Sequence, residues 1–246
     1  MKIEFLNSLK SFTQEILYDS GKPCVLCGKP AGPVCSDCND EYFFPQADRC
    51  HMCGKIIKKG KHLCDGCTAG HGPKKLSKVT AWGNYEGAWK EFIWAVKFKY
   101  QPYRLVEIGK PFSQWALTNL PPVDALVPIP MHFEREAERG FNQAEVIASL
   151  LHWELGIPLL KVLERIAPTN PQVGLTRLER LNNLKGVINL SSNSVQGLSL
   201  WLIDDVTTTG ATLEAGAEAL LKGGAKEVYG LCLAAGIEKS LVTPVD

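Results

Sequence analysis

The chain has 246 residues, enough for one large domain or two modest ones, with 45% hydrophobic and 22% charged residues. This composition is ordinary for a folded globular protein and excludes a disordered chain. No uninterrupted apolar run approaches about 18 residues, so a membrane-spanning helix is also excluded. A formal net charge of +1 indicates no particular class of partner.

The N-terminal segment, residues 1–20, is predicted to be an amphipathic helix, because Phe5, Leu9, Phe12 and Ile16 recur at spacings of three and four. It lacks the continuous apolar core and the small-residue cleavage site of a signal peptide, so we expect a cytoplasmic protein. The apolar face is expected to pack against the protein itself. Peripheral docking to a membrane surface, or to a partner, is the alternative.

Residues 21–77 contain four CxxC pairs and are predicted to form a double zinc ribbon. Each CxxC turn supplies two thiolates and zinc takes four ligands in a tetrahedron, so eight cysteines make two closed, structural sites. Consecutive pairs would share an ion, with a cross-braced pairing as the alternative; iron–sulfur ligation fits the doubled pairs less well. The predicted ligands are Cys24, Cys27, Cys35, Cys38, Cys50, Cys53, Cys64 and Cys67.

The remaining cysteine, Cys232, lies in an apolar run and is predicted to be a small buried hydrophobe. Metal-bound thiolates fit a reducing, intracellular compartment better than a disulfide framework does.

Basic residues concentrate between Arg49 and Lys78, where eight Lys and Arg residues accompany a single acid, Asp65. Each four-thiolate zinc site would carry a formal charge of about −2, which partly neutralises this stretch. We expect a solvated face around a metal site, with a surface for nucleic-acid phosphates as the alternative.

From residue 78 onward, strand and helix patterns alternate, which predicts an α/β fold with a mostly parallel sheet. The expected strands are residues 78–85, 124–130, 186–190, 198–204 and 227–235, and the expected helices are 88–100, 142–156 and 211–224. The helix over 88–100 is rich in aromatic and basic residues. Its spacing favours a core role for the aromatic residues, with base stacking as the alternative. We therefore expect three parts: 1–20, 21–77 and 78–246.

The stretch WLIDDVTTTGAT, residues 201–212, predicts a site for a phosphorylated sugar. Two acids at the carboxyl end of a strand suit ribose hydroxyls, directly or through magnesium. The helix that follows presents unpaired N–H groups to a phosphate, and threonine hydroxyls add donors. An ordinary helix cap explains one Thr or Asp but not all of them. The candidate residues are Asp204, Asp205, Val206, Thr207, Thr208, Thr209, Gly210, Ala211 and Thr212.

IDDVTTTGAT resembles the signature with which type I phosphoribosyltransferases bind phosphoribosyl pyrophosphate (PRPP). With PIPMHFEREAERGFNQAE, TNPQVGLTRLERLNNLKG and the paired cysteines, the chain resembles the ComF family over roughly residues 24–235. The resemblance implies a type I phosphoribosyltransferase-like sheet, mostly parallel and flanked by helices, preceded by a small zinc-ribbon domain. It also implies that Asp204 and Asp205 hold the ribose hydroxyls while residues 207–212 cradle the 5′-phosphate.

Two further roles follow from the resemblance. A loop after the first core strand would face the pyrophosphate, whose developing negative charge needs cations; its residues are Pro130, Met131, Arg135 and Arg139. A flap over 167–186 would close on the ligand with Gln172, Arg177 and Arg180. A solvated surface position is the alternative for each of these arginines.

The resemblance implies a PRPP-binding protein that handles internalised single-stranded DNA in natural transformation, with the DNA-uptake machinery as a partner. The alternative is an active, magnesium-dependent phosphoribosyltransferase with an unknown base or amine acceptor, because no residue in the sequence identifies a catalytic group. A metal-ribbon scaffold with a relic site is a third hypothesis.

Overall fold

The computed structural model describes residues 22–43, 48–166, 186–191 and 195–238. The predicted N-terminal helix and almost all of the predicted flap, including Gln172, Arg177 and Arg180, lie outside the described residues. By packing, the chain divides into two compact units, 1–45 and 46–246. The smaller unit contains the first four cysteines and helix α2 (Ser36–Tyr42). The second four belong to the larger unit.

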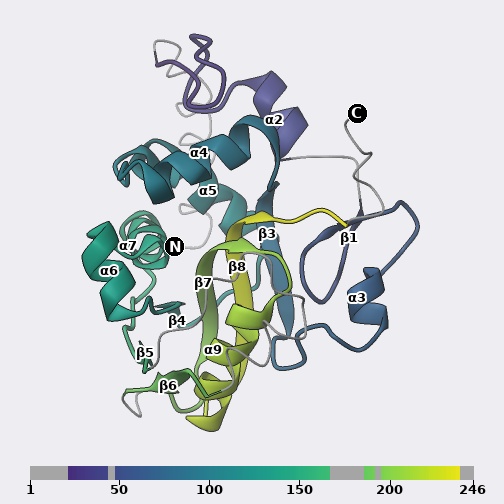
Figure 1. Ribbon diagram of the computed structural model, residues 1–246, viewed down its shortest axis with the longest axis vertical. Coiled ribbons are helices and arrows are strands. Elements are labelled where there is room, and N and C mark those ends of the chain that lie inside the picture. The colour runs from purple at the N-terminus through teal and green to yellow at the C-terminus, as the bar shows by residue number, and fades with distance from the viewer. Residues whose placement is uncertain (1–21, 44–47, 167–185, 192–194, 239–246) are drawn as a thin grey trace, which may run out of the picture. The chain divides into compact units, whose positions relative to one another are not determined.

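The larger unit is built on a four-stranded parallel sheet (Figure 1). Its strands are β3 (Lys78–Asn84), β4 (Ala125–Pro128), β7 (Ser199–Thr207) and β8 (Glu227–Ala235), in the order β3-β8-β7-β4. Strand β7 reads as a continuous apolar run because Leu200, Trp201, Leu202 and Ile203 are all buried, which is typical of a parallel strand covered on both faces. The predicted α/β class with a mostly parallel sheet is confirmed.

Helices cover both faces of this sheet (Figure 1). On one side lie α4 (Gly87–Phe98), α5 (Arg104–Asn119) and α7 (Gln143–Leu155). On the other, α9 (Ala211–Lys222) packs Leu213, Ala217 and Leu220 into the same buried cluster as Leu200 and Leu202. A small antiparallel pair, β5 (Leu163–Arg165) and β6 (Ile188–Leu190), lies beside α9, and the short helix α6 (Phe133–Arg139) follows β4.

Helix α5 was not among the expected elements. Its sequence contains Gly109 and Pro111, two residues that ordinarily interrupt helices. Tertiary packing overrides them, because Leu105, Ile108, Phe112 and Ala116 are all buried. Gly109 faces α7, because a Cβ at this position would lie in ordinary van der Waals contact with Leu150, 3.5 Å from a methyl carbon.

The second cysteine group is joined directly to the main sheet. It comprises β1 (Asp48–Arg49), β2 (Ile56–Ile57) and α3 (Asp65–Thr68). Beyond the end of β8, the Ile56 N–H donates to the Gly236 carbonyl at 3.2 Å, and the Glu238 N–H donates to the Ile56 carbonyl at 2.9 Å. The buried Glu238 carboxylate accepts from the Asp65 N–H at 2.7 Å. None of the helices in the described parts of the chain is long and apolar enough to cross a membrane.

Candidate functional site

The acid pair lies within β7 rather than after it, because the strand continues through Thr207, beyond the expected end at residue 204. Asp204 is half-buried, and its Oδ1 accepts a hydrogen bond from the Asp205 N–H at 2.8 Å. On β8, the register partner of Asp204 is Cys232, which is fully buried as expected. Asp204 and Asp205 therefore both stand on β7, a central strand of the sheet.

A lysine from α4 neutralises part of this acidic charge. Lys97 Nζ lies 2.8 Å from Asp205 Oδ2, and both side chains are mostly buried. Burial alone would lower the pKa of Lys97, but Asp205 and Asp204 raise it above its ordinary value. Burial, together with the negative charge of Asp205, raises the pKa of Asp204 to about 7. Asp204 therefore exchanges protons near neutral pH.

Three arginines complete the electrostatic surroundings of the acid pair. Arg135 and Arg139 come from α6 and Arg165 comes from β5. Arg139 interacts electrostatically with Asp205, and Arg165 with Asp204. Burial lowers the pKa of both Arg139 and Arg165. The structure thus brings the predicted acid pair close to the predicted pyrophosphate loop.

Lys97 and Arg165 were missed by the sequence analysis. Lys97 had one available signal, because it stands four residues after Ile93, on the otherwise apolar face of its helix. Arg165 had no comparable signal, since it reaches the site from a three-residue strand distant in sequence.

The RGFNQ stretch fixes the position of the predicted pyrophosphate loop. Gly140 ends α6 with φ 74°, a left-handed conformation that glycine adopts without strain. The Asn142 side chain caps α7 by accepting from the Ala144 N–H at 3.0 Å, and it donates to the Ile129 carbonyl at 2.9 Å. Arg139 donates to the Gln143 Oε1 at 3.0 Å. The two remaining loop residues, Pro130 and Met131, are half-buried between β4 and α6.

The turn between β7 and α9 has features of an anion seat. Gly210 stands at the helix N-cap with φ 77° and supplies no side-chain cap, although the Thr209 hydroxyl accepts from the Ala211 N–H at 3.3 Å. Thr207 is 3% exposed, and its hydroxyl has no hydrogen-bond partner within the described residues. A buried, unsatisfied hydroxyl is rare in a folded protein and indicates a place where a ligand or water completes the structure. Three further residues of the predicted site are half-buried: Val206, Thr208 and Thr212.

The segment after the second cysteine group supports this turn. A Cβ at Gly210 would lie 3.1 Å from Pro73 Cγ, so the two residues are in close contact. The backbone N–H groups of Lys74 and Lys75 donate to Glu214 Oε2 at 2.8 and 2.9 Å. Glu214 lies in the first turn of α9. The ribbon and the phosphate turn are therefore parts of one packed structure.

The cysteines form two metal-binding groups from consecutive pairs, not a cross-braced arrangement. Cys24, Cys27, Cys35 and Cys38 make one group and Cys50, Cys53, Cys64 and Cys67 the other, with the four sulfurs of each within 4.8 Å of one another. Sulfurs bound to a tetrahedral zinc at about 2.3 Å would lie about 3.8 Å apart. The Cys27–Cys35 and Cys53–Cys64 sulfur distances are 3.6 and 3.7 Å. The donor sets therefore fit tetrahedral zinc.

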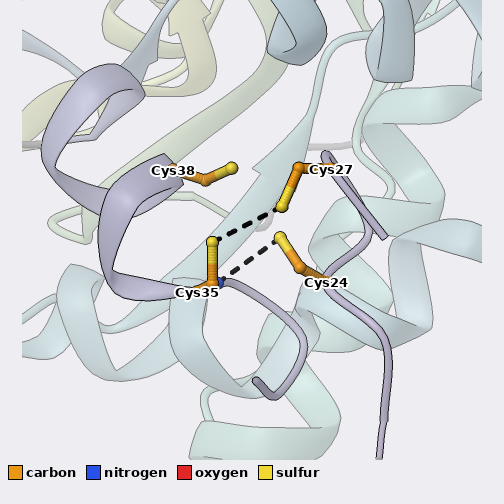
Figure 2. A group of neighbouring side chains, drawn as sticks. All are labelled: Cys24, Cys27, Cys35 and Cys38. Carbon is orange, nitrogen blue, oxygen red and sulfur yellow. Dashed lines mark hydrogen bonds between the residues drawn. The ribbon is translucent and has the colours of Figure 1, made fainter. Parts of the chain in front are cut away.

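The first group draws its ligands from a turn and a helix start (Figure 2). Cys35 is the N-cap of α2, and its backbone N–H donates to the Cys24 sulfur at 3.4 Å. Burial alone would raise the pKa of Cys24, but backbone N–H groups, foremost that of Cys35, lower it to about 7. This lowered pKa favours the thiolate that a metal requires.

Known proteins similar to this chain include competence proteins and DNA utilization proteins. Competence protein F of Haemophilus influenzae is 30% identical over 214 residues, which cover 82% of this chain and 90% of that one. Competence protein ComFC of Bacillus subtilis is 30% identical over 202 residues, covering 80% and 81%. DNA utilization protein YhgH of Salmonella typhi is 29% identical over 203 residues, covering 75% and 88%.

No family model matches the chain. Among solved structures, a purine phosphoribosyltransferase from Pyrococcus horikoshii Ot3 aligns with a TM-score of 0.31 and 23% identity, covering 58% of this chain and 73% of that one. The two competence proteins align over most of their length at 30% identity, and the chain therefore belongs to the ComF family.

Proposed function

We propose that this protein binds PRPP with magnesium at the carboxyl end of β7 and acts on the cytoplasmic side of DNA uptake, handling internalised single-stranded DNA in natural transformation. Membership of a family that contains competence and DNA utilization proteins supports the DNA role. The single observation that carries PRPP binding is the half-buried acid pair on β7, followed by a turn that leads into the N-terminus of α9, with cationic residues around the pair.

Each group at the site has a chemical role in this proposal. Asp204 and Asp205 accept hydrogen bonds from the ribose hydroxyls, with Asp205 exchanging part of its contact with Lys97 for the sugar. The turn over 207–212 holds the 5′-phosphate with backbone N–H groups and threonine hydroxyls, including the unpartnered hydroxyl of Thr207.

Arg135 and Arg139 face the pyrophosphate and stabilise its charge. Magnesium, when bound with PRPP, would be held by the carboxylate oxygens of the acid pair and would neutralise ligand charge there.

Zinc in both cysteine groups is the structural part of the proposal. Closed four-thiolate sites leave no position for a substrate, so the ions stabilise short segments that bury little apolar surface of their own.

Calorimetric titration of PRPP with magnesium tests the site. The double change Asp204→Asn plus Asp205→Asn should abolish binding, because amides cannot replace the charged acceptors at a magnesium-assisted diol site. Glu218→Gln is the matched control. Glu218 lies on α9 and pairs with Lys222 at 2.8 Å, so this variant should bind PRPP like the wild type. A folded, zinc-loaded wild type that binds no PRPP would contradict the proposal.

A second candidate function, phosphoribosyl transfer to a base or amine, is favoured by one observation. The pKa of Asp204 is raised to about 7, which is where a general acid or base works best at neutral pH. Pyrophosphate release from PRPP and magnesium, followed across a panel of nucleobases and amines, tests this function. Binding without release for every acceptor would leave PRPP as a ligand only.

A further inference from the structure

We propose that single-stranded DNA stacks its bases on an aromatic strip formed by Trp94, Phe98 and Tyr100, on the exposed face of α4 and just beyond its C-terminal end. This inference rests on the proposed DNA role and names the surface that binds the strand. Lys99 and Arg139 are the cationic members of the strip.

The rings of Trp94 and Phe98 are exposed and adjacent, and Tyr100 is exposed two residues further along the chain. Trp94 is 47% exposed, Phe98 52% and Tyr100 60%. The Trp94 and Phe98 ring centroids lie 5.6 Å apart, as expected for residues four apart on a helix. A single exposed aromatic side chain is unremarkable, but neighbouring exposed rings form an apolar surface that marks an interaction site.

These rings are not the ones that build the core. Helix α4 buries Trp89, Phe92, Ile93 and Val96, which satisfies its packing against the sheet. The expectation that the aromatic residues of 88–100 are core therefore holds for Trp89 and Phe92. Trp94 and Phe98 lie on the other face of the same helix, where packing requires no aromatic residue.

A cation lies near each of the Trp94 and Phe98 rings. Lys99 Nζ lies 5.6 Å from the Trp94 ring centroid, and Arg139 Cζ lies 5.2 Å from that of Phe98. Arg139 also interacts with Asp205, so the strip is continuous with the proposed PRPP site. Non-specific recognition of a single strand combines such rings, which stack bases, with cations that follow the backbone.

The backbone at Tyr100 is a second, independent observation. Tyr100 has φ 54°, and it is the one non-glycine residue with positive φ in the described parts of the chain. It follows the C-cap of α4, where glycine is the usual occupant, and a bulky residue there is strained. Strain of this kind is retained mainly at functional positions.

The charge around the strip favours a single strand over a protein partner. Between residues 88 and 104 the sequence has Lys90, Lys97, Lys99 and Arg104 against Glu91. Lys97 is paired with Asp205. The other three basic residues outnumber Glu91, and this excess of positive charge attracts phosphates. A duplex would keep its bases stacked inside and could not use the rings.

Fluorescence anisotropy with a labelled oligo-dT strand tests the proposal in the full-length, zinc-loaded protein. The double change Trp94→Ala plus Tyr100→Gly should weaken binding by about tenfold or more, since each stacked base is lost with its ring. Trp153→Ala is the matched control: Trp153 is 86% exposed near the far end of α7 and should not affect DNA affinity. Lys99→Gln should reduce the salt dependence of binding by about one phosphate contact.

Two results would overturn the strip. One is oligo-dT affinity that is unchanged in the double variant, as expected if the strip serves a protein partner or if DNA lies elsewhere. The other is a wild type that does not bind the strand at all. PRPP titration on the same proteins separates this outcome from a failure of the proposed site, because neither Trp94 nor Tyr100 is assigned a PRPP contact.

Discussion

A carboxyl group with a pKa of about 7 inside a folded protein is held there at a cost in stability. Asp204 is half-buried and stands beside Asp205, and both the burial and the neighbouring negative charge disfavour its charged form. Its ordinary pKa is 3.8. Between these two values the folded state binds more protons than the unfolded state, so the free energy of unfolding falls as the pH rises through this window.

Asp204→Asn should therefore stabilise the protein above neutral pH, where the buried charge is otherwise present. We expect a gain on the order of 1 to 4 kcal/mol at about pH 8 and little change at about pH 4. Urea unfolding at both pH values measures it. A gain of equal size at both would show that the pKa of Asp204 is not the cause. A gain seen only at the higher pH would mean that Asp204→Asn, one half of the double change expected to abolish PRPP binding, stabilises the protein, as expected where function retains a destabilising group.

For Asn142 we expect a substitution to lower the stability, because both the oxygen and the nitrogen of its side chain are hydrogen-bonded. Asn142→Ala removes both the cap of α7 and the bond to the Ile129 carbonyl. We expect a loss of about 2 to 3 kcal/mol in the free energy of unfolding. Asn142→Ser keeps an oxygen that can cap α7 and loses the bond to the Ile129 carbonyl, so it should lose less stability than the alanine variant. Equal losses would mean that the cap contributes nothing.

At the scale of elements, the sequence predicted those helices and strands whose formation depends on residues close together in the chain. The strands of the main sheet and helix α9 follow from apolar runs and glycine stops, and the acid pair and threonine turn follow from their place between a strand and a helix. Helix α5 could not be predicted, since only packing against α7 and β3 overrides Gly109 and Pro111. Lys97 and Arg165 reach the site because the fold brings α4 and β5 close to the acid pair on β7. No local sequence pattern predicts that proximity.

The turn before α9 and the turn before β7 each contain a glycine with positive φ, and the two make a matched pair. Gly210 and Gly197 have φ of 77° and 75°, so alanine is strained equally at both. A Cβ at Gly210 meets Pro73, whereas nothing lies within 4 Å at Gly197. We expect Gly197→Ala to lose about 1 kcal/mol of stability and to keep PRPP affinity. Gly210→Ala should lose more stability and also weaken PRPP binding. Equal effects on PRPP would show that the Pro73 contact does not shape the turn.

At the scale of the molecule, the second cysteine group and the phosphate turn form one connected structure. Pro73 contacts Gly210, Lys74 and Lys75 hold Glu214, and Glu238 joins α3 to the end of β8. A metal that fixes α3 therefore also fixes the segment that supports the turn. The charge-rich stretch from Arg49 to Lys78 is accounted for in part by this support, since Lys61 also pairs with Asp65 at 2.7 Å.

Loss of metal from the second group should consequently weaken PRPP binding. We expect Cys67→Ser to lower zinc content by one ion and PRPP affinity by about 2- to 30-fold, the range for coupling through packed networks. Cys24→Ser, which perturbs the metal group of the smaller unit, is the matched control for general effects of zinc loss. Zinc content and calorimetric PRPP titration are measured on the same folded samples. If Cys67→Ser loses its ion and stays folded with unchanged PRPP affinity, the ribbon supports the fold alone, and the contacts at Pro73 and Glu214 transmit nothing to the ligand site.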